Sequence, residues 1–526
     1  MDEAQGVEVP QASRISAAAV LLAASVLLSR VLGYAREALL AYRVGAGAST
    51  DAYYAAFQIP DLLNYLLAGG ALSIAFVPLY TKYLARDDRA AADHLLSTVL
   101  GTLTALAAIA TALLWWFAEP LIALQFPRFD PATQAMTTHL TRIVLPAQVF
   151  FIAGGIVNAT LFAHGRFGAA ALAPLLYNGG IIAGGLLLAP QMAVSVEGFA
   201  WGALAGALLG PFLAPVLYAR GRVSMRARIA PLDRVFLGYL LVAAPLMFGQ
   251  TLLTVDEWYQ RWFGALLGAG AVSHLSYARR LMQVPVAVVG QAIAAAALTA
   301  LSRLFAEHRQ SELNRVVLRT LQASVALAIF AAAGCFALAT PLVQLVYQHG
   351  AFRADDTVQV AAILALLCFA VPAWIAQQII ARAFYARADT WRPMLLGTVV
   401  AVASIPLYRA LGQVDGVRGL AIASAVGMTI SAGATLIWAR WLHGAPALGR
   451  LLATCARATL VAVPAAAVAH WVAGAPAAST ASALTAVAIG LILFAALSAA
   501  GTVWVGDDAM RELLRRLLRR AGRRGG

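Results

Sequence analysis

The chain alternates long apolar runs with short polar or charged segments along almost its whole length. A window of about 19 residues, which matches a membrane-spanning helix, finds fourteen such runs. Because most of them are long enough to cross a bilayer, the pattern predicts an all-α integral membrane protein with about 14 transmembrane helices. The runs cover residues 15–43, 52–84, 92–117, 136–163, 169–190, 195–219, 232–256, 265–302, 314–338, 357–385, 392–412, 417–441, 450–474 and 480–505.

Composition excludes an ordinary soluble enzyme. Of the 526 residues, 61% are apolar and 12% are charged, against about 45–50% and about 25% in soluble domains. The formal charge of +14 is consistent with nucleic-acid binding, but basic residues also collect in cytoplasmic loops. With the N-terminus in the cytoplasm, 27 arginine and lysine residues fall on the cytoplasmic side and 6 on the other. This asymmetry predicts that both termini are cytoplasmic, and it explains the charge without nucleic acid.

Two sequence matches at nearly one spacing indicate an internal duplication. The Gln-Xaa-Pro motifs at 58–60 and 283–285 lie 225 residues apart, and the Pro-Ala pairs at 146–147 and 372–373 lie 226 apart. Each copy would hold six spans, an even number, so a pseudo-two-fold axis along the membrane normal would relate two six-helix lobes. The predicted parts are a cytoplasmic N-terminal segment (1–14), the first lobe (15–228), the second lobe (229–445), two C-terminal helices (446–506) and a basic amphipathic tail (507–526).

The tail contains the sequence RELLRRLLRR at residues 511–520. A helix of this sequence gathers leucines on one side and arginines on the other. Such a helix is typical of segments that lie on a surface of anionic membrane lipids. A disordered basic tail is the alternative.

Several ionisable residues interrupt the apolar runs and are candidates for a binding site. Arg30 and Arg36 lie well inside the first run, Asp51 opens the second, and Arg279 and Arg280 interrupt the eighth. A guanidinium at the bilayer centre costs from about 3 to above 10 kcal/mol unless it meets water or an opposite charge. Its planar fork binds phosphate bidentately, so these arginines favour an anionic ligand in a central cavity.

Neighbouring acids offer a simpler explanation for some of these charges. Arg36 could pair with Glu37 or Asp51, and the other arginine of the first run could extend to an interface. Asp256 and Glu257, near the end of the seventh run, are candidates for a cation site, although carboxylates that merely flank a helix are the more common case.

The chain contains no motif that indicates enzyme chemistry. Walker A, HExxH and GxSxG motifs do not occur in a plausible context, and the eight histidines and three cysteines are scattered. The sequence therefore predicts a transporter with no cofactor and no metal catalysis.

Four dispersed segments carry a family resemblance. They are SRVLGYAREALLAYRVGAGASTDAYYAAFQIPDLL (29–63), SYARRLMQVPVAVVG (276–290), YQHGAFRADDT (347–357) and ARAFYARADTWRP (381–393). The chain resembles the MurJ/MviN family of lipid II flippases, within the multidrug/oligosaccharidyl-lipid/polysaccharide exporter superfamily. The resemblance implies two lobes around a cationic cavity, with the last two helices forming a groove for a polyprenyl tail. It also implies that the protein moves lipid II, an undecaprenyl-pyrophosphate-linked peptidoglycan precursor, outward across the bacterial inner membrane by alternating access.

The resemblance also implies roles for particular residues. The family's cavity arginines correspond by position to Arg30, Arg36 and Arg280, and the acid at the start of its second helix corresponds to Asp51. These four are therefore the expected substrate-binding residues, with Arg279 as a further cavity candidate. The partner expected is the lipid-linked saccharide, and a monomer is the expected state. Coupling to the membrane potential or to a monovalent ion remains open.

The chain departs from the family at positions that often carry charge. The eleventh helix also lacks the polar amides common there, which places a family-type sodium site in doubt. Asn64 and Gln283 remain candidates for the cavity even without a charge. The departing positions are Gln58, Asn64, Gly69 and Gln283.

These departures leave three alternatives to a lipid II flippase. The protein could carry another polyprenyl-linked glycan, or it could be a transport-inactive scaffold for cell-wall enzymes. A cation-coupled drug exporter is disfavoured, because its cationic ligands require carboxylates rather than arginines in the cavity.

Overall fold

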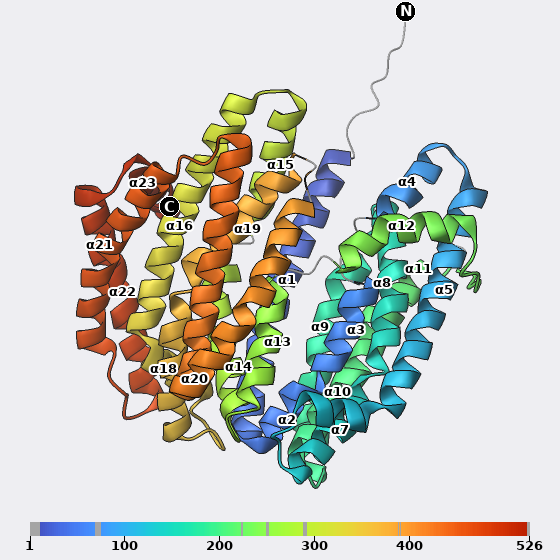
Figure 1. Ribbon diagram of the computed structural model, residues 1–526, viewed down its shortest axis with the longest axis horizontal. Helices are drawn as coiled ribbons and strands as arrows, with labels where there is room; N and C mark the ends of the chain where they lie inside the picture. Colours follow the sequence, from blue (N-terminus) through green and yellow to red (C-terminus); the bar gives the residue numbers. More distant parts are fainter. Residues whose placement is uncertain are drawn as a thin grey trace, which may run out of the picture. The chain divides into compact units, whose positions relative to one another are not determined.

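The computed structural model describes residues 11–68, 75–221, 223, 225–248, 252–287, 292–387, 389 and 391–522. Regular structure in these residues is helical throughout, with no strand, which confirms the predicted all-α class. Figure 1 shows the helices coloured along the chain. They form two compact units, of which the first contains Met1–Val44 and Ala52–Phe248 and the second contains Gly45–Asp51 and Gly249–Gly526.

The first unit is built from the helices of the N-terminal half. Short helix α2 (Ala48–Ala56) begins in the second unit and ends in the first. The others are α1 (Gln11–Val44), α3 (Gln58–Ala68), α4 (Val77–Ala85), α5 (Arg89–Trp116), α6 (Ala118–Gln125), α7 (Pro131–Val144), α8 (Ala147–Ala163), α9 (Gly168–Ala183), α10 (Ser195–Ala207), α11 (Ala214–Ala219) and α12 (Arg234–Phe248).

Glycines determine how closely α9 and α10 approach. A methyl group added at Gly180 would meet the backbone of Gly206 and Gly202, and one added at Gly198 would meet the backbone of Ala189. Small residues let two apolar helices touch along their backbones, which stabilises helix pairs in lipid by van der Waals packing. Helix α1 packs on α9 in turn, so this glycine-lined pair supports the helix that carries the predicted arginines.

Helix α12 packs within the first unit, although the sequence analysis places it at the start of the second lobe. Phe236 and Tyr239 are buried in one hydrophobic cluster with residues of α4, α5 and α8. Asp233 begins α12 by accepting a hydrogen bond from the Val235 amide at 2.9 Å and lies 3.0 Å from His94 of α5. The Val235 amide, His94 and Arg228 hold the pKa of Asp233 below its usual range.

The second unit contains the C-terminal half. The element labelled α20 contains two helices, which correspond to the predicted spans 392–412 and 417–441, because the backbone leaves the helical region at Asp415 and Gly416. The helices are α13 (Leu252–Gly264), α14 (Ala271–Pro285), α15 (Ala292–Ala306), α16 (Gln310–Ala337), α17 (Ala339–Tyr347), α18 (Ala354–Cys368), α19 (Val371–Tyr385), α20 (Trp391–His443), α21 (Leu448–Ala473), α22 (Thr480–Val505) and α23 (Asp508–Gly522).

Matching helix breaks in the two units support the predicted duplication. The 28-residue helix α5 is followed after a single residue, Phe117, by the short α6. The 28-residue helix α16 is followed after a single residue, Leu338, by the short α17. A proline stands at a second matching break, where Pro146 separates α7 from α8 and Pro372 lies in the first turn of α19.

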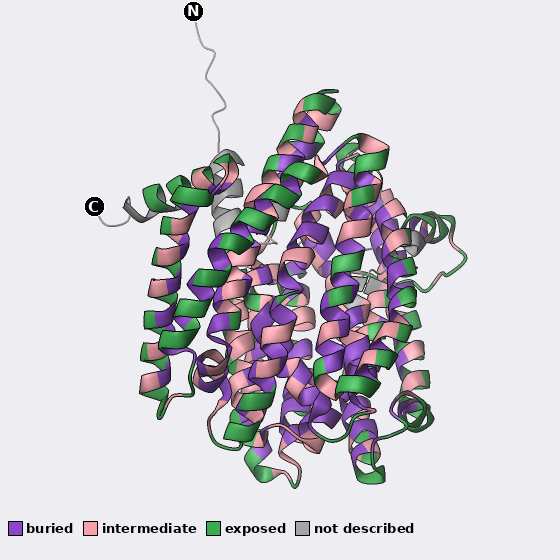
Figure 2. Ribbon diagram, turned by 60° about the vertical axis from the view of Figure 1, so that its left-hand side comes forward, coloured by how far each residue is buried: buried purple, intermediate pink, exposed green. Residues whose placement is uncertain are grey.

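The outer surfaces of these helices are suited to lipid. Trp116, Trp441, Trp471 and Trp504 lie near the ends of long helices and are at least 72% exposed, as interfacial tryptophans are in membranes. Figure 2 shows buried and exposed positions alternating along the helices.

The helices that meet the length and composition of a membrane span are fewer than predicted. Eight elements in the described residues qualify, or nine if α18 and α19, bent by 43°, count as one span, and α20 is counted once although it contains two helices. Some of the other predicted runs are described only in part: 52–84 overlaps α2, α3 and α4, and 232–256 contains α12 and the beginning of α13. The total of fourteen therefore stays a prediction.

Candidate functional site

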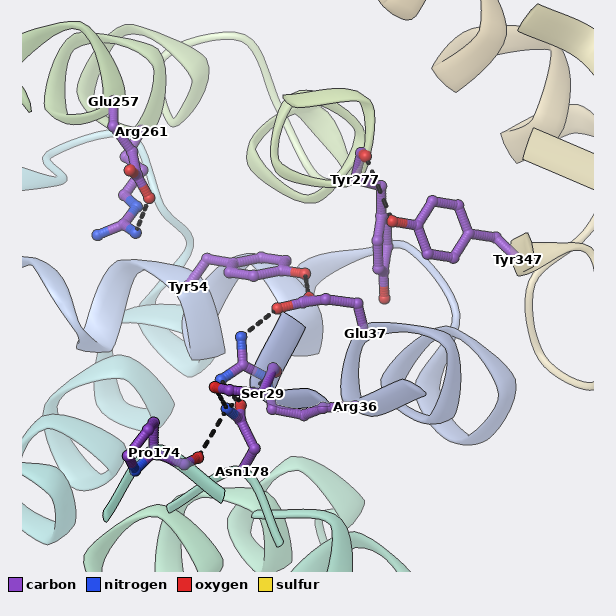
Figure 3. Close-up of polar contacts among 10 residues, drawn as sticks. All are labelled: Ser29, Arg36, Glu37, Tyr54, Pro174, Asn178, Glu257, Arg261, Tyr277 and Tyr347. Atoms are coloured by element: carbon purple, nitrogen blue, oxygen red, sulfur yellow. Dashed lines mark hydrogen bonds and ion pairs between the residues drawn. The ribbon is translucent and has the colours of Figure 1, made fainter. Parts of the chain in front are cut away.

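Arg36 is the centre of a polar network inside the first unit. Its Nη2 lies 2.5 Å from Glu37 Oε1, and its Nη1 donates to Asn178 Oδ1 of α9 at 3.1 Å. Tyr54 of α2 donates to the other Glu37 oxygen at 2.5 Å. Asn178 is itself oriented, because its amide donates to Ser29 Oγ at 3.2 Å. Figure 3 shows the guanidinium between Glu37 and Asn178.

This network fixes the position of a charge in an apolar environment. The Arg36 side chain is 16% exposed and that of Glu37 3%, so both charges are largely removed from water. An ion pair of this kind is stable only if the remaining polar atoms are also hydrogen-bonded. The simpler explanation of Arg36, pairing with Glu37, is therefore observed. Tyr54 and Asn178 were not among the residues predicted from the sequence, although a lone asparagine in an apolar run is a recognisable signal.

The other arginine of the first helix, Arg30, is half-buried six residues before Arg36. Six residues turn an α-helix by about 600°, so the two side chains leave α1 roughly 120° apart and about 9 Å apart along its axis. A single phosphate group therefore need not contact both Arg30 and Arg36.

Two of the neutral residues at positions that often carry charge in the family, Gln58 and Asn64, lie in α3. Asn64 donates to Gln148 Oε1 of α8 at 3.0 Å, which makes an uncharged pair between two helices of the first unit. Gln58 is buried, and its Oε1 has no hydrogen-bond partner in the described part of the chain. Gly69 lies outside the described residues. The side-chain amide at position 64 is thus hydrogen-bonded to a side-chain amide of α8.

Asp51 has a structural role in the second unit. Its two carboxylate oxygens accept the Gly270 amide at 2.6 Å and the Ser273 amide at 2.7 Å, at the beginning of α14. Tyr277 of α14 donates to the Gly45 carbonyl at 3.0 Å, so the short segment 45–51 is held at both ends. Both carboxylate oxygens are thus hydrogen-bonded to backbone amides, and Asp51 is 0% exposed. The geometry therefore supports a positioning role rather than the expected substrate contact.

Asp256 is the centre of a second buried network. It is 0% exposed and accepts hydrogen bonds from Arg279, from Tyr408, from Ser424 at 3.0 Å and from Gln260 at 3.3 Å. The expectation that Asp256 and its neighbour flank the end of a span is wrong, because both lie inside α13.

The rest of this network neutralises a second acid. Glu257 lies 2.5 Å from Arg261 Nη2 and 4.0 Å from Arg279 Nε. Arg279 also lies over the Trp374 ring, 5.4 Å from its centroid. Figure 3 shows the Glu257 and Arg261 pair. Arg261 and Arg279 thus form ion pairs with the two acids of this network.

The contacts of Asp256 and Arg279 limit the roles that the predicted site residues of the second unit can have. A metal cation at Asp256 would have to displace the Arg279 guanidinium, and the described residues contain no group of three or more metal-ligating side chains. Arg279 itself is 4% exposed, so it is part of the packed interior rather than a cavity wall. Its neighbour Arg280 and Gln283, one turn further along α14, are half-buried.

The second unit also contains an apolar groove with a volume of about 580 Å³. It is lined by the end of α14 and by residues of α16, α17, α22 and α23, including Phe330, Phe494 and Leu514. The volume lies in the range of about 300–1,000 Å³ that is usual for ligand sites. Because its lining is almost wholly apolar, the groove is suited to a hydrocarbon chain.

Solved structures with this arrangement of helices are transporters. A structure described as lipid II flippase MurJ in an inward closed conformation covers 92% of this chain and 99% of its own, with a TM-score of 0.77 and 22% identity. An inward-facing multidrug resistance MATE family transporter of the MOP superfamily covers 81% of this chain and 98% of its own, with a TM-score of 0.69 and 15% identity. The chain therefore shares its fold with these two structures.

Sequence comparison narrows this class to one family. The model of the family described as lipid II flippase MurJ matches residues 40–498. Lipid II flippase MurJ of Burkholderia cenocepacia is 30% identical over 417 residues, which are 77% of this chain and 80% of that protein. A probable lipid II flippase MurJ of Vibrio cholerae is 27% identical over 80% of this chain and 82% of its own. The chain belongs to the MurJ family, which is a family of multi-pass membrane transporters and not of enzymes.

Proposed function

We propose that this protein carries lipid II from the cytoplasmic to the outer face of the bacterial inner membrane. Membership of the MurJ family is the observation that carries the proposal. The chemistry of the two units supports it, because the first holds a largely desolvated guanidinium and the second holds an apolar groove. A pyrophosphate joined to a long hydrocarbon chain needs a site of each kind.

In this proposal Arg30 and Arg36 of the first unit and Arg280 of the second each serve to bind the anionic substrate. Glu37 and Asn178 fix the plane of the Arg36 guanidinium, so little conformational entropy is lost when a phosphate binds it. Glu37 also accepts a hydrogen bond from Tyr54, which can hold the carboxylate when an anionic ligand takes its place at the guanidinium. The polar network thus makes Arg36 an exchangeable anion site inside an apolar bundle.

The membrane potential is the driving force that fits these charges. With both termini in the cytoplasm and a potential that is negative inside, outward movement of an anionic headgroup is favoured by about 2.3 kcal/mol per charge per 100 mV. The saturated coordination of Asp256 supports a potential over a monovalent metal ion, because Arg279 already neutralises this carboxylate. No cofactor enters the proposal.

Complementation tests the proposed function directly. A strain depleted of its own lipid II flippase receives the wild type or the Arg30→Ala, Arg36→Ala or Arg280→Ala variant at matched abundance. The wild type is expected to restore growth and the three variants to lose it. Arg303→Ala is the matched control, because Arg303 is 80% exposed and forms only a surface pair with Glu307, and it should restore growth.

Each negative result of these experiments would contradict a different part of the proposal. A wild type that inserts normally but does not restore growth would contradict the flippase and favour the scaffold or a carrier of a different glycan. Growth with all three arginine variants would contradict the anion site. Reporter fusions after Arg89 and at the C-terminus should both indicate the cytoplasm, and an outside signal from either would contradict the proposed orientation.

A further inference from the structure

The loop that leads into α12 is held against α5 in the first unit. The Arg228 amide donates to the Ser97 carbonyl at 2.9 Å. Two residues further along the loop, the Ala230 amide donates to the Thr102 hydroxyl at 3.0 Å. A methyl group added at Gly101 would lie 2.4 Å from the Arg228 carbonyl oxygen, so a side chain at this position would push the loop away. The loop therefore has a defined place, at the end of the first unit where Figure 1 shows α4 and α12.

The position of the loop along α5 places it at the membrane interface. Residues 95–116 of α5 contain no charged side chain, and Trp116 at their far end is 72% exposed. Interfacial tryptophans mark the edge of the hydrocarbon layer, whose thickness of about 30 Å corresponds to about 20 helical residues. Counting back from Trp116 brings the opposite edge to about Ser97, the residue whose carbonyl binds the loop.

The loop presents basic and aliphatic side chains together. Arg226 and Arg234 are exposed, and the side chain of neither forms an ion pair or a hydrogen bond with another described residue. Ile229 is 69% exposed and Leu232 is 84% exposed. Aliphatic side chains are unfavourable in water, whereas arginines are unfavourable in hydrocarbon. The boundary between the hydrocarbon and the lipid headgroups accommodates both kinds of side chain.

We propose that residues 225–234 form a binding site for anionic phospholipids, with headgroup phosphates on Arg226 and Arg234 and acyl chains around Ile229 and Leu232. Each arginine near an anionic surface favours binding about fivefold. An acidic protein would also match the arginines, but it would not explain two exposed aliphatic side chains at the depth of the lipid. The basic helix α23, where the sequence analysis expects the same lipids, belongs to the second unit and is a separate site. The inference goes beyond the proposed function, because it concerns the lipid that surrounds the first unit and not the molecule that the protein carries.

Quenching by brominated lipids tests this site in the full chain. A bimane label is attached to Ile229→Cys in a variant whose three native cysteines are replaced by alanine. The protein is placed in phosphatidylcholine nanodiscs with rising mole fractions of phosphatidylglycerol or phosphatidylcholine that is brominated on its acyl chains. We expect both brominated lipids to quench the label, because residue 229 lies among acyl chains. Phosphatidylglycerol should quench at lower mole fractions, because it is also bound by the arginines.

Matched variants separate lipid recognition from a loss of folding. Arg226→Gln and Arg234→Gln should each lower the preference for phosphatidylglycerol about fivefold. Arg228 is left unchanged, because its Nη1 lies 3.3 Å from His94 Nδ1 and helps to hold the loop. Arg89→Gln is the control and should leave the preference unchanged. Arg89 is exposed at the start of α5, about 12 Å along the helix from Ser97, which exceeds the Debye length of about 10 Å at 0.1 M salt.

Three results would overturn the proposal. Absence of quenching by both lipids would exclude the loop from the bilayer and favour an acidic protein as its partner. Equal quenching by both lipids, or an unchanged preference in both loop variants, would exclude selectivity for anionic lipid. An equal loss of preference in Arg89→Gln would show that the overall charge of the protein, and not the loop, attracts the lipid. Complementation is measured in parallel, and a wild type that prefers phosphatidylglycerol but does not restore growth contradicts only the flippase.

Discussion

The buried pair of Asp256 and Arg279 gives the sharpest test of how the second unit is stabilised. The perturbation is Arg279→Gln, which keeps a polar side chain of similar length but removes the charge. Asp256, which is 0% exposed, would then retain Tyr408, Ser424 and Gln260 as donors but lose its ion-pair partner. Removing one member of a buried ion pair costs about 3–5 kcal/mol, because the other charge is left without compensation.

The reverse substitution should cost less. In Asp256→Asn, Arg279 keeps Glu257, whose Oε2 lies 4.0 Å from its Nε, and the face of the Trp374 ring. A double variant, Asp256→Asn with Arg279→Gln, contains two neutral amides that can bond to each other. Its loss of stability should therefore be smaller than the sum for the two single variants by at least about 2 kcal/mol.

Equilibrium unfolding in mixed micelles with rising dodecyl sulfate measures these free energies through the native tryptophans. Arg303→Gln is the control, because Arg303 and Glu307 form an exposed pair whose loss should cost at most about 1 kcal/mol. Costs below about 1 kcal/mol for both single variants, and additivity in the double variant, would refute the reasoning. A rise in wild-type stability on adding sodium would also refute it, because it would indicate a cation at Asp256.

Three further predictions follow from the first unit. If lipid II is the substrate, Asn64→Arg should strengthen its binding or leave it unchanged, because a charge-assisted contact is worth about 1.5–3 kcal/mol. A loss of complementation at matched abundance would instead indicate a different headgroup. Gly198→Leu should destabilise the bundle, because the added side chain meets the backbone of Ala189; an unchanged unfolding midpoint would contradict this packing. Asp130 accepts hydrogen bonds from the Thr133 side chain and amide, and these lower its pKa. Its contribution to stability should therefore be present at neutral pH and be lost as pH falls through that lowered value, and a midpoint in Asp130→Asn with the same acid dependence as the wild type would contradict this.

The sequence by itself determined the class of protein. Long apolar runs can satisfy their backbone hydrogen bonds in lipid only as helices, so an all-α membrane protein followed from the pattern before any contact was known. The basic tail is a further case, because the leucines and arginines of 511–520 already specify an amphipathic helix. An internal duplication was also predicted, and Pro146 and Pro372 lie at similar helix breaks in the two units.

Tertiary structure decided which charges are paired. From the sequence, Arg279 and Arg280 are adjacent and chemically identical, but the direction in which each leaves α14 places one of them against Asp256. Asp51 was expected to contact the substrate, yet two backbone amides near the beginning of α14 occupy its oxygens. Partners more than a hundred residues away, such as Asn178 for Arg36, lie on another helix, and no local pattern specifies which helices will pack together. The hydrophobic periodicity of a helix indicates which of its faces contacts lipid or water. The pairing of buried charges depends instead on which helices pack against each other.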